Sequence, residues 1–226
     1  MLRAVIFDLD GTLANTISGI REGVNRTMQA YGFPTHTNAD ILSFINNGAR
    51  MLIKRAMPAE VREDDALLTR VLADYDAFYG QTYSHGVYPY EGIPKAVQAL
   101  HGRLGLRIAV LSNKQDAYVK GLCEALLPAG VCELAQGVAP GMPAKPDVRL
   151  TQRVLDALGV APHECVLVGD SNVDILTAEQ AGMEHVSVTW GFRSEEFLRQ
   201  NGARRIVHTP DELVRVIEFM KEGCKA

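Results

Sequence analysis

The chain has 226 residues, of which 47% are hydrophobic and 22% are charged, and its net charge is -4. This length allows one large α/β domain, or a domain that carries a smaller insertion, and the composition is that of an ordinary globular protein. The acidic balance excludes a basic nucleic-acid footprint over the whole surface. The sequence has no apolar run near the ~20 residues that cross a bilayer. We therefore expect neither nucleic acid nor a membrane as a partner.

The first residues and the cysteines favour a cytoplasmic protein. The first three residues lead directly into a short apolar run and then into acids, which is not the pattern of a signal peptide. The four cysteines, Cys123, Cys132, Cys165 and Cys224, match no zinc-ligand spacing. We expect them to be reduced thiols that are mostly buried. We also expect the protein to be a monomer or a homodimer.

Short β-branched runs alternate with helical patterns through most of the chain. Ile93, Val97 and Leu100 lie on one helical face before the second run, and a similar face ends at Gly159, which we expect to cap its helix. Such alternation predicts an α/β fold with a Rossmann-like parallel sheet, covered on both faces. The predicted strands are 3–7, 107–111, 165–168, 185–189 and, with a weaker pattern, 204–207.

One region breaks the alternation. Between about residues 15 and 83 the apolar residues recur at helical spacing, in three segments, and Asn47-Gly48 interrupts the second of these. The pattern predicts a small α-helical cap domain over 15–84, inserted into a core domain formed by 1–14 and 85–226. Tyr88–Gly92 contains the proline and glycine that suit a hinge where the chain re-enters the core.

Two acids, Asp8 and Asp10, directly follow the first predicted strand. Ligands of an open parallel sheet bind beyond the carboxyl ends of its strands. Two carboxylates so close together repel, and a cation or a shared proton must compensate. Asp-Gly is also a common turn dipeptide, so this motif by itself leaves a simple turn open.

A second pair of acids follows the third predicted strand. Asp170 lies on the loop, and Asp174 lies about one turn into the next helix. These positions also suit a helix N-cap followed by an acid in the first turn. Acids at two strand ends can converge, however, and one or two carboxylates with waters and phosphate oxygens are the ligands that Mg²⁺ commonly takes.

Candidate anion-binding groups lie at the end of the second predicted strand and on one loop. Ser112 ends the second predicted strand beside Asn113, and we expect its hydroxyl and the amides of a helix that begins there to receive an anion. Lys145 stands between two prolines, which stiffen the loop that carries it. A helix cap and a solvated lysine are the simpler interpretations of these two features.

Taken together, these groups indicate a phosphate-handling site. One aspartate can then act as the nucleophile, because carboxylates form aspartyl-phosphate intermediates. The acid two residues further on can protonate the leaving oxygen and then activate water. A magnesium ion and Lys145 would neutralise the charge on the phosphoryl group.

Four segments of the chain resemble, in this order, the four motifs of the haloacid dehalogenase superfamily. They are Asp8-Leu9-Asp10-Gly11-Thr12, Leu111-Ser112-Asn113, Lys145-Pro146 and Gly169-Asp170-Ser171-Asn172-Val173-Asp174. The match spans essentially the whole chain, and the helical insertion resembles the cap of one branch of small-molecule phosphatases and phosphomutases. The resemblance implies Mg²⁺ as the cofactor and a small phosphate ester as the substrate.

The resemblance also implies a role for each matching residue. Asp8 would be the nucleophile and a metal ligand, and Asp10 the general acid and base, with its backbone carbonyl on the metal. Asp170 would ligate the metal, and Asp174 would support the metal site. Ser112 and Lys145 would bind the phosphoryl group, and we include their neighbour Asn113 among the substrate-binding residues.

Within the branch, Ser112-Asn113-Lys114, Trp190-Gly191-Phe192 and Asn47-Gly48-Ala49-Arg50 most resemble phosphoglycolate phosphatases. Arg50 would pair with a substrate carboxylate, although a solvated helix arginine is an equally ordinary interpretation. The favoured substrate is therefore 2-phosphoglycolate.

Other functions stay open at this stage. A phosphomutase similar to β-phosphoglucomutase, or a phosphatase or pyrophosphatase for another small metabolite, would use the same scaffold. A signalling receiver domain is about half this length and has no helical insertion. A non-catalytic binding module has no need of two crowded carboxylates.

Overall fold

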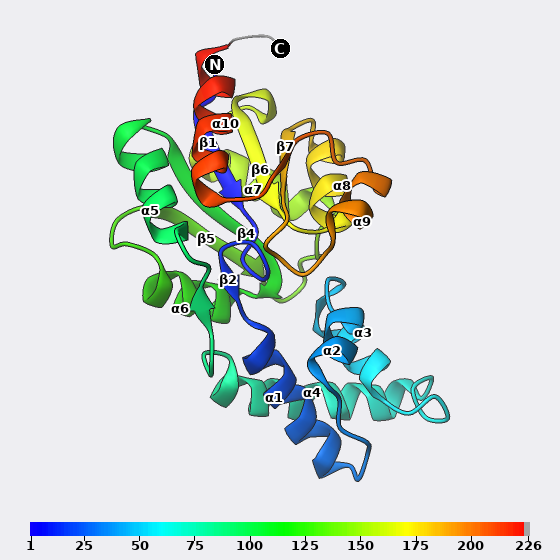
Figure 1. The fold of residues 1–226 in the computed structure, drawn as a ribbon. Coiled ribbons are helices and arrows are strands. Elements are labelled where there is room, and N and C mark those ends of the chain that lie inside the picture. Colours follow the sequence, from blue (N-terminus) through cyan, green and yellow to red (C-terminus); the bar gives the residue numbers. More distant parts are fainter. Residues whose placement is uncertain (224–226) are drawn as a thin grey trace. The chain divides into compact units, whose positions relative to one another are not determined.

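The computed structural model describes residues 1–223, and Figure 1 shows its elements. The chain divides into two compact units, one formed by Met1–Ala14 with the residues from Pro89 onward, and the other by Asn15–Tyr88. The chain leaves and re-enters the larger unit through two short strands that pair with each other, β2 (Ala14–Asn15) and β3 (Tyr88–Pro89). The predicted boundary at residues 84 and 85 lies slightly before this re-entry.

A six-stranded parallel sheet forms the centre of the larger unit, in the order β5-β4-β1-β6-β7-β8. Counted along the chain within this unit, that order is 3-2-1-4-5-6, the order of a Rossmann fold. The direction of winding reverses between β1 and β6, which creates a crevice at their carboxyl ends. The strands are β1 (Ala4–Phe7), β4 (Arg107–Gln115), β5 (Cys132–Val138), β6 (Cys165–Gly169), β7 (Glu184–Val188) and β8 (Ile206–Val207).

Helices connect these strands and bury both faces of the sheet. In β1, Ala4 and Ile6 pack into a cluster with the apolar face of α7, while Val5 and Phe7 alternate to the opposite face and are also buried. Gly159 ends α7 in the left-handed conformation, which confirms the predicted cap. The helices are α5 (Ile93–Gln98), continued by η1 (Ala99–Arg103), α6 (Asp116–Leu126), α7 (Val148–Leu158), η2 (Pro162–Glu164), α8 (Asn172–Ala181), α9 (Glu195–Gln200) and α10 (Pro210–Glu222).

The five predicted strands are all present, and β5 is the member of the six-stranded sheet that the sequence did not reveal. Its segment contains Glu133, Gln136 and Gly137 among its apolar residues and is only partly buried, because it lies at the edge of the sheet. The strand β4 ends later than residue 111, where the sequence pattern predicts its end. Pairing of Gln115 with Val138 extends β4 beyond Ser112, and the next helix begins only at Asp116. The expectation that Ser112 stands at a helix start is therefore wrong.

The smaller unit is helical, as predicted. It consists of α1 (Ile17–Ala30), α2 (Asn38–Phe44), α3 (Gly48–Ala56) and α4 (Asp65–Thr82). Thr37 and Asp40 form a reciprocal capping box at the start of α2. The predicted interruption between α2 and α3 is a tight turn in which Asn46 and Gly48 both have a positive φ, of 88° and 78°.

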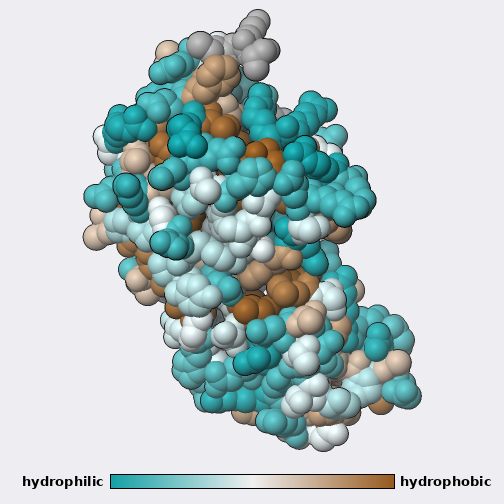
Figure 2. Space-filling model, in the orientation of Figure 1, coloured by the Kyte–Doolittle hydropathy of each residue, from teal (hydrophilic) through white to brown (hydrophobic). Residues whose placement is uncertain are grey.

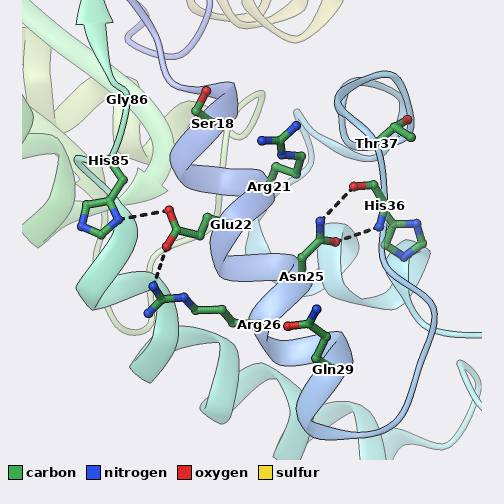
Figure 3. Close-up of a pocket in the computed structure, with 10 residues that line it drawn as sticks. All are labelled: Ser18, Arg21, Glu22, Asn25, Arg26, Gln29, His36, Thr37, His85 and Gly86. Atoms are coloured by element: carbon green, nitrogen blue, oxygen red, sulfur yellow. Dashed lines mark hydrogen bonds and ion pairs between the residues drawn. The ribbon is translucent and has the colours of Figure 1, made fainter.

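A polar pocket of about 770 Å³ lies along α1 in the smaller unit (Figure 3). Glu22 accepts hydrogen bonds from Arg26 and His85, at 2.6 and 3.1 Å, and so joins α1 to the segment that follows α4. The side chain of Asn25 bonds both backbone groups of His36. These bonds fix the two walls of the pocket to its helical floor.

The surface in view is mostly hydrophilic (Figure 2). Among residues 1–223, the helices lack the length and apolar character that spanning a bilayer requires. Cys123 and Cys165 are buried and Cys132 is partly buried, and all three are free thiols, whereas Cys224 lies outside the described residues. Large apolar side chains are exposed at positions from different elements, namely Met1, Met51, Tyr88, Val148, Leu176 and Phe219.

The central strand β6 provides a test of the core. Leu167 is fully buried in the cluster under α7, so Leu167→Ala should lower the free energy of unfolding by about 2–5 kcal/mol. Leu176→Ala, at an exposed position of α8, is the matched control and should have a much smaller effect. Urea unfolding followed by the fluorescence of Trp190, the single tryptophan, would measure both. Equal losses of unfolding free energy in the two variants would contradict the packing of Leu167 in the core.

Candidate active site

Asp8 and Asp10, the two predicted acids of the first motif, follow the end of β1 at the crevice. The backbone N–H of Asp8 donates to the carbonyl of Val168 at 2.9 Å, which continues the ladder between β1 and β6. The chain then turns tightly, with the amides of Leu13 and Ala14 both bonded to the carbonyl of Leu9. Gly11 takes part in this turn with a φ of 89°. Asp8 is thereby buried at the strand end.

Asp170 is fixed between two turns of the same unit. One carboxylate oxygen accepts the Thr12 hydroxyl at 3.2 Å, and the other accepts the backbone N–H of Phe192 at 2.7 Å. A Cβ on Gly191 would lie 2.4 Å from both the Cβ of Asp170 and the carbonyl oxygen of Gly11. The glycine thus permits a close approach that no other residue allows.

Trp190 adds a further contact to those of Thr12, Phe192 and Gly191 that hold Asp170, which together we call the clamp around Asp170. Its indole N–H donates to the carbonyl of Thr12 at 3.0 Å and ties the Trp190–Phe192 turn to the turn after β1. The sequence singled out Trp190-Gly191-Phe192 only through a resemblance. The structure shows a physical purpose for it, because the segment holds Asp170 and the first motif together.

Asp174 caps a helix and also pairs with a buried charge. One oxygen accepts both the backbone N–H and the hydroxyl of Ser171, at 3.1 and 2.6 Å, which makes the capping box of α8. Its other oxygen accepts the ammonium of Lys145 at 2.7 Å. The acid is therefore both a helix cap and a buried charge partner.

Lys145 is buried and bonds three acceptors. Its Nζ donates to Asp8 at 2.8 Å, to Asp174 at 2.7 Å and to the carbonyl of Leu111 at 3.0 Å. An ammonium has three donors, so these bonds satisfy it fully. Its burial excludes the simpler alternative of a solvated surface lysine, and the ammonium offsets the charge of two neighbouring acids.

Asn113 positions this lysine. Its side chain accepts the backbone N–H of Lys145 at 2.6 Å and donates to the carbonyl of the same residue at 3.1 Å. Ser112 is buried in β4, where its hydroxyl accepts the N–H of Lys114 at 3.3 Å. The substrate-binding roles of Ser112 and Asn113 stay predictions, although the contacts of Asn113 favour a positioning role.

Three of the predicted acids form a buried cluster. Asp8, Asp170 and Asp174 each offer a carboxylate oxygen, and these oxygens lie within 4.8 Å of one another. An all-oxygen set of this charge fits a hard divalent cation such as Mg²⁺. The side chain of Asp10 is not among these oxygens, and the expected ligand from that residue, its backbone carbonyl, stays a prediction.

The electrostatics of the cluster fit a cation too. Burial raises the pKa of Asp8 to about 7, opposed by Lys145 and supported by the charges of Asp174 and Asp10. Burial, with the charges of Asp174 and Asp8, raises the pKa of Asp170 well above its usual value. Burial alone would raise the pKa of Asp174 as well, but the charge of Lys145 and its hydrogen bond hold it below the usual value. A bound cation would favour the ionised form of all three.

Lys114 is the residue that the sequence analysis did not assign. Its ammonium lies 2.8 and 3.1 Å from the two carboxylate oxygens of Asp10, and the pair joins β4 to the turn after β1. The sequence feature that could have indicated a role for Lys114 is its position two residues after Ser112, in a segment that resembles a family motif. Arg50, in the smaller unit, pairs with Asp65 at 2.8 Å and is half-exposed.

A family model described as haloacid dehalogenase-like hydrolase matches residues 5–188, a span that contains the four motifs just described. The chain belongs to this family. It is 31% identical over 196 residues to the phosphoglycolate phosphatase of Thiobacillus denitrificans, covering 84% of this chain and 85% of the relative. It is 33% identical over 203 residues to that of Rhodospirillum rubrum, covering 86% and 83%.

Solved structures of this hydrolase family have the same fold. A Lactobacillus delbrueckii subsp. bulgaricus protein, provisionally described as a phosphoglycolate phosphatase, superposes with a TM-score of 0.88 and 31% identity over 95% of this chain and 98% of its own. A haloacid dehalogenase-like family hydrolase from Streptococcus pneumoniae has a TM-score of 0.84, covering 96% and 98%. At 20% identity the second shows the fold alone. The predicted Rossmann-like α/β class is confirmed.

The clamp around Asp170 predicts a specific effect of Gly191→Ala. The new methyl group would displace Asp170 or the Gly11 turn, and changes beside a metal ligand weaken metal binding by about 10–100-fold. Titration calorimetry with MgCl₂ would measure this loss. Gly102→Ala is the matched control, because a Cβ there meets nothing within 4 Å. Equal affinity of both variants would show that the close approach has no bearing on the cluster.

The raised pKa of Asp8 makes the metal-free protein sensitive to pH. A carboxyl with a raised pKa in the folded state stabilises that state at low pH, and the stabilisation is lost as the pH rises through about 7. Asp8→Asn removes the charge, so with EDTA present its Tm should exceed that of the wild type at pH 8, by at least about 2–4 °C. The advantage should shrink towards pH 5.

Differential scanning calorimetry across this pH range would provide the measurement. Asp156→Asn, an exposed change of the same kind on α7, controls for the loss of one surface carboxylate. A wild type that is more stable than Asp8→Asn at pH 8 would contradict the pKa assigned to Asp8.

Proposed function

We propose that the protein is a Mg²⁺-dependent phosphatase that hydrolyses a small phosphate monoester through an aspartyl-phosphate on Asp8. The observation that carries this proposal is the buried cluster of Asp8, Asp170 and Asp174 with Lys145 beside it, at the carboxyl edge of the sheet. Two acids that follow the same strand, each paired with a different lysine, suit two different chemical roles.

In the first step the carboxylate of Asp8 attacks the phosphorus atom and the ester P–O bond breaks. The leaving alkoxide takes a proton from Asp10. In the second step Asp10, now a carboxylate, removes a proton from water, and the water oxygen attacks the phosphorus atom. Inorganic phosphate leaves and the carboxylate of Asp8 is restored.

Asp8, Asp170 and the backbone carbonyl of Asp10 would hold the Mg²⁺ ion, and Asp174 would support them. When bound, the ion would neutralise charge on the phosphoryl oxygens. The Nζ of Lys145 lies 2.8 Å from the attacking carboxylate and would exchange one of its three present acceptors for an oxygen of the phosphoryl group, which Ser112 would also bind. The hydrogen bonds from Thr12 and Phe192 keep Asp170 in a fixed orientation for the ion.

The substrate proposed is 2-phosphoglycolate. The support is the name shared by relatives that are about 30% identical over most of the chain. Arg50 would bind the substrate carboxylate, exchanging the exposed Asp65 for it. The helical unit Asn15–Tyr88 would serve as a cap, and a cytoplasmic location and a monomeric or homodimeric state stay predictions from the sequence.

Phosphate release from a panel of phosphate esters, with Mg²⁺ or with EDTA, tests this function. We expect turnover that requires Mg²⁺ and prefers 2-phosphoglycolate. Asp8→Asn should lower kcat to background, by at least about 10⁴-fold, because it removes the nucleophile.

The same variant should stay folded by circular dichroism, since asparagine preserves the size of the side chain and its acceptor for Lys145. Full activity of Asp8→Asn would sink the mechanism. Isomerisation of a sugar phosphate without release of free phosphate would instead identify a phosphomutase.

A further inference from the structure

The ion pair between Lys114 and Asp10 goes beyond the proposed catalytic set. The ammonium of Lys114 contacts both oxygens of the Asp10 carboxylate, at 2.8 and 3.1 Å. The side chain of Lys114 is only 4% exposed and that of Asp10 only 19%. Desolvating a lysine costs free energy that a close, doubly contacted partner must offset. The buried, doubly contacted pair is therefore a specific part of the structure at the strand ends.

The local structure of β4 aims this lysine. The pairing of β4 with β5 is irregular between Leu111 and Gln115, and the N–H of Lys114 bonds the Ser112 hydroxyl. The last part of β4 therefore departs from regular strand pairing, near the end of β1. Lys114 reaches the turn after β1 from this irregular segment.

The two acids of the first motif thus have separate lysine partners. Lys145 contacts one oxygen of Asp8 and leaves the other oxygen without that contact. Lys114 contacts both oxygens of Asp10, which opposes rotation of the carboxylate about its Cβ–Cγ bond. A nucleophile needs a free oxygen, whereas a proton donor and acceptor needs a fixed direction.

We propose that Lys114 is a positioning residue that fixes the carboxylate of Asp10 for proton transfer to the leaving ester oxygen and from the attacking water. This inference rests on the proposed function. Lys114 acts through Asp10, so its loss impairs the steps that need proton transfer. A general acid or base contributes about 10²–10⁴-fold to a rate, and misplacing it forfeits part of that factor.

Two esters separate this role from a merely structural one. Departure of an alkoxide from 2-phosphoglycolate needs a proton, whereas p-nitrophenolate leaves without one. Lys114→Met should lower kcat/KM for 2-phosphoglycolate by about 10²-fold and kcat/KM for p-nitrophenyl phosphate by less than about 5-fold.

The second step gives an independent signal. If water activation by Asp10 is slowed, aspartyl-phosphate accumulates. Rapid mixing of Lys114→Met with p-nitrophenyl phosphate should then produce a burst of p-nitrophenolate equal to the enzyme concentration. Lys114→Arg, which keeps the charge, should restore part of the kcat/KM for 2-phosphoglycolate.

Lys120→Met is the matched control, because Lys120 is an exposed lysine on α6 that pairs with Asp116 away from the acids of the site. It should behave as the wild type with both esters. Circular dichroism checks that the variants fold, and Lys114→Gln replaces Lys114→Met if the latter does not.

The outcomes distinguish the two proposals. An active wild type with equal kcat/KM losses for both esters in Lys114→Met, and no burst, overturns the positioning role of Lys114 alone. Unchanged kinetics of Lys114→Met do the same. A wild type that releases phosphate from neither ester, with Mg²⁺ present, overturns the proposed function and this inference with it.

Discussion

The buried ammonium of Lys145 is the interaction on which the site depends. It bonds Asp8, Asp174 and the carbonyl of Leu111, and so connects the end of β1, the middle of β4 and the first turn of α8. Three buried carboxylates would otherwise repel each other strongly in a medium of low dielectric constant. Burial alone would lower the pKa of Lys145, but the charges of Asp174 and Asp8 and their hydrogen bonds raise it above its ordinary value. The lysine therefore stays charged where the acids need a cation.

The sheet topology supplies the rest of the constraint. Reversal of the winding between β1 and β6 places the segments that follow these two strands at one crevice, and each segment carries two acids. The Trp190–Phe192 turn then locks Asp170 against the turn after β1, through one indole bond, one amide bond and a glycine that permits the approach. Burial raises the pKa of Asp8 and of Asp170, so ionising these carboxyls in the folded state costs free energy.

Much of this arrangement could be predicted from the sequence, because the features concerned are local. Buried β-branched runs gave the strands, helical periodicity gave the inserted unit, and Gly159 marked the end of α7. The missed edge strand β5 has a mixed composition, and its pairing with β4 decided where β4 ends and where α6 begins. Pairing between distant segments leaves no periodic mark on either one.

The sequence by itself therefore determined the residue types of the site and their attachment to strand ends, since motif and hydrophobic pattern are read along one segment. Only the tertiary structure decided which groups meet. It brought Lys145 to Asp8 and Asp174, Asn113 to the backbone of Lys145, and Lys114 to Asp10. These partners are separated by 29 to 137 positions, and their pairing follows from strand order and local bulges that no single segment encodes.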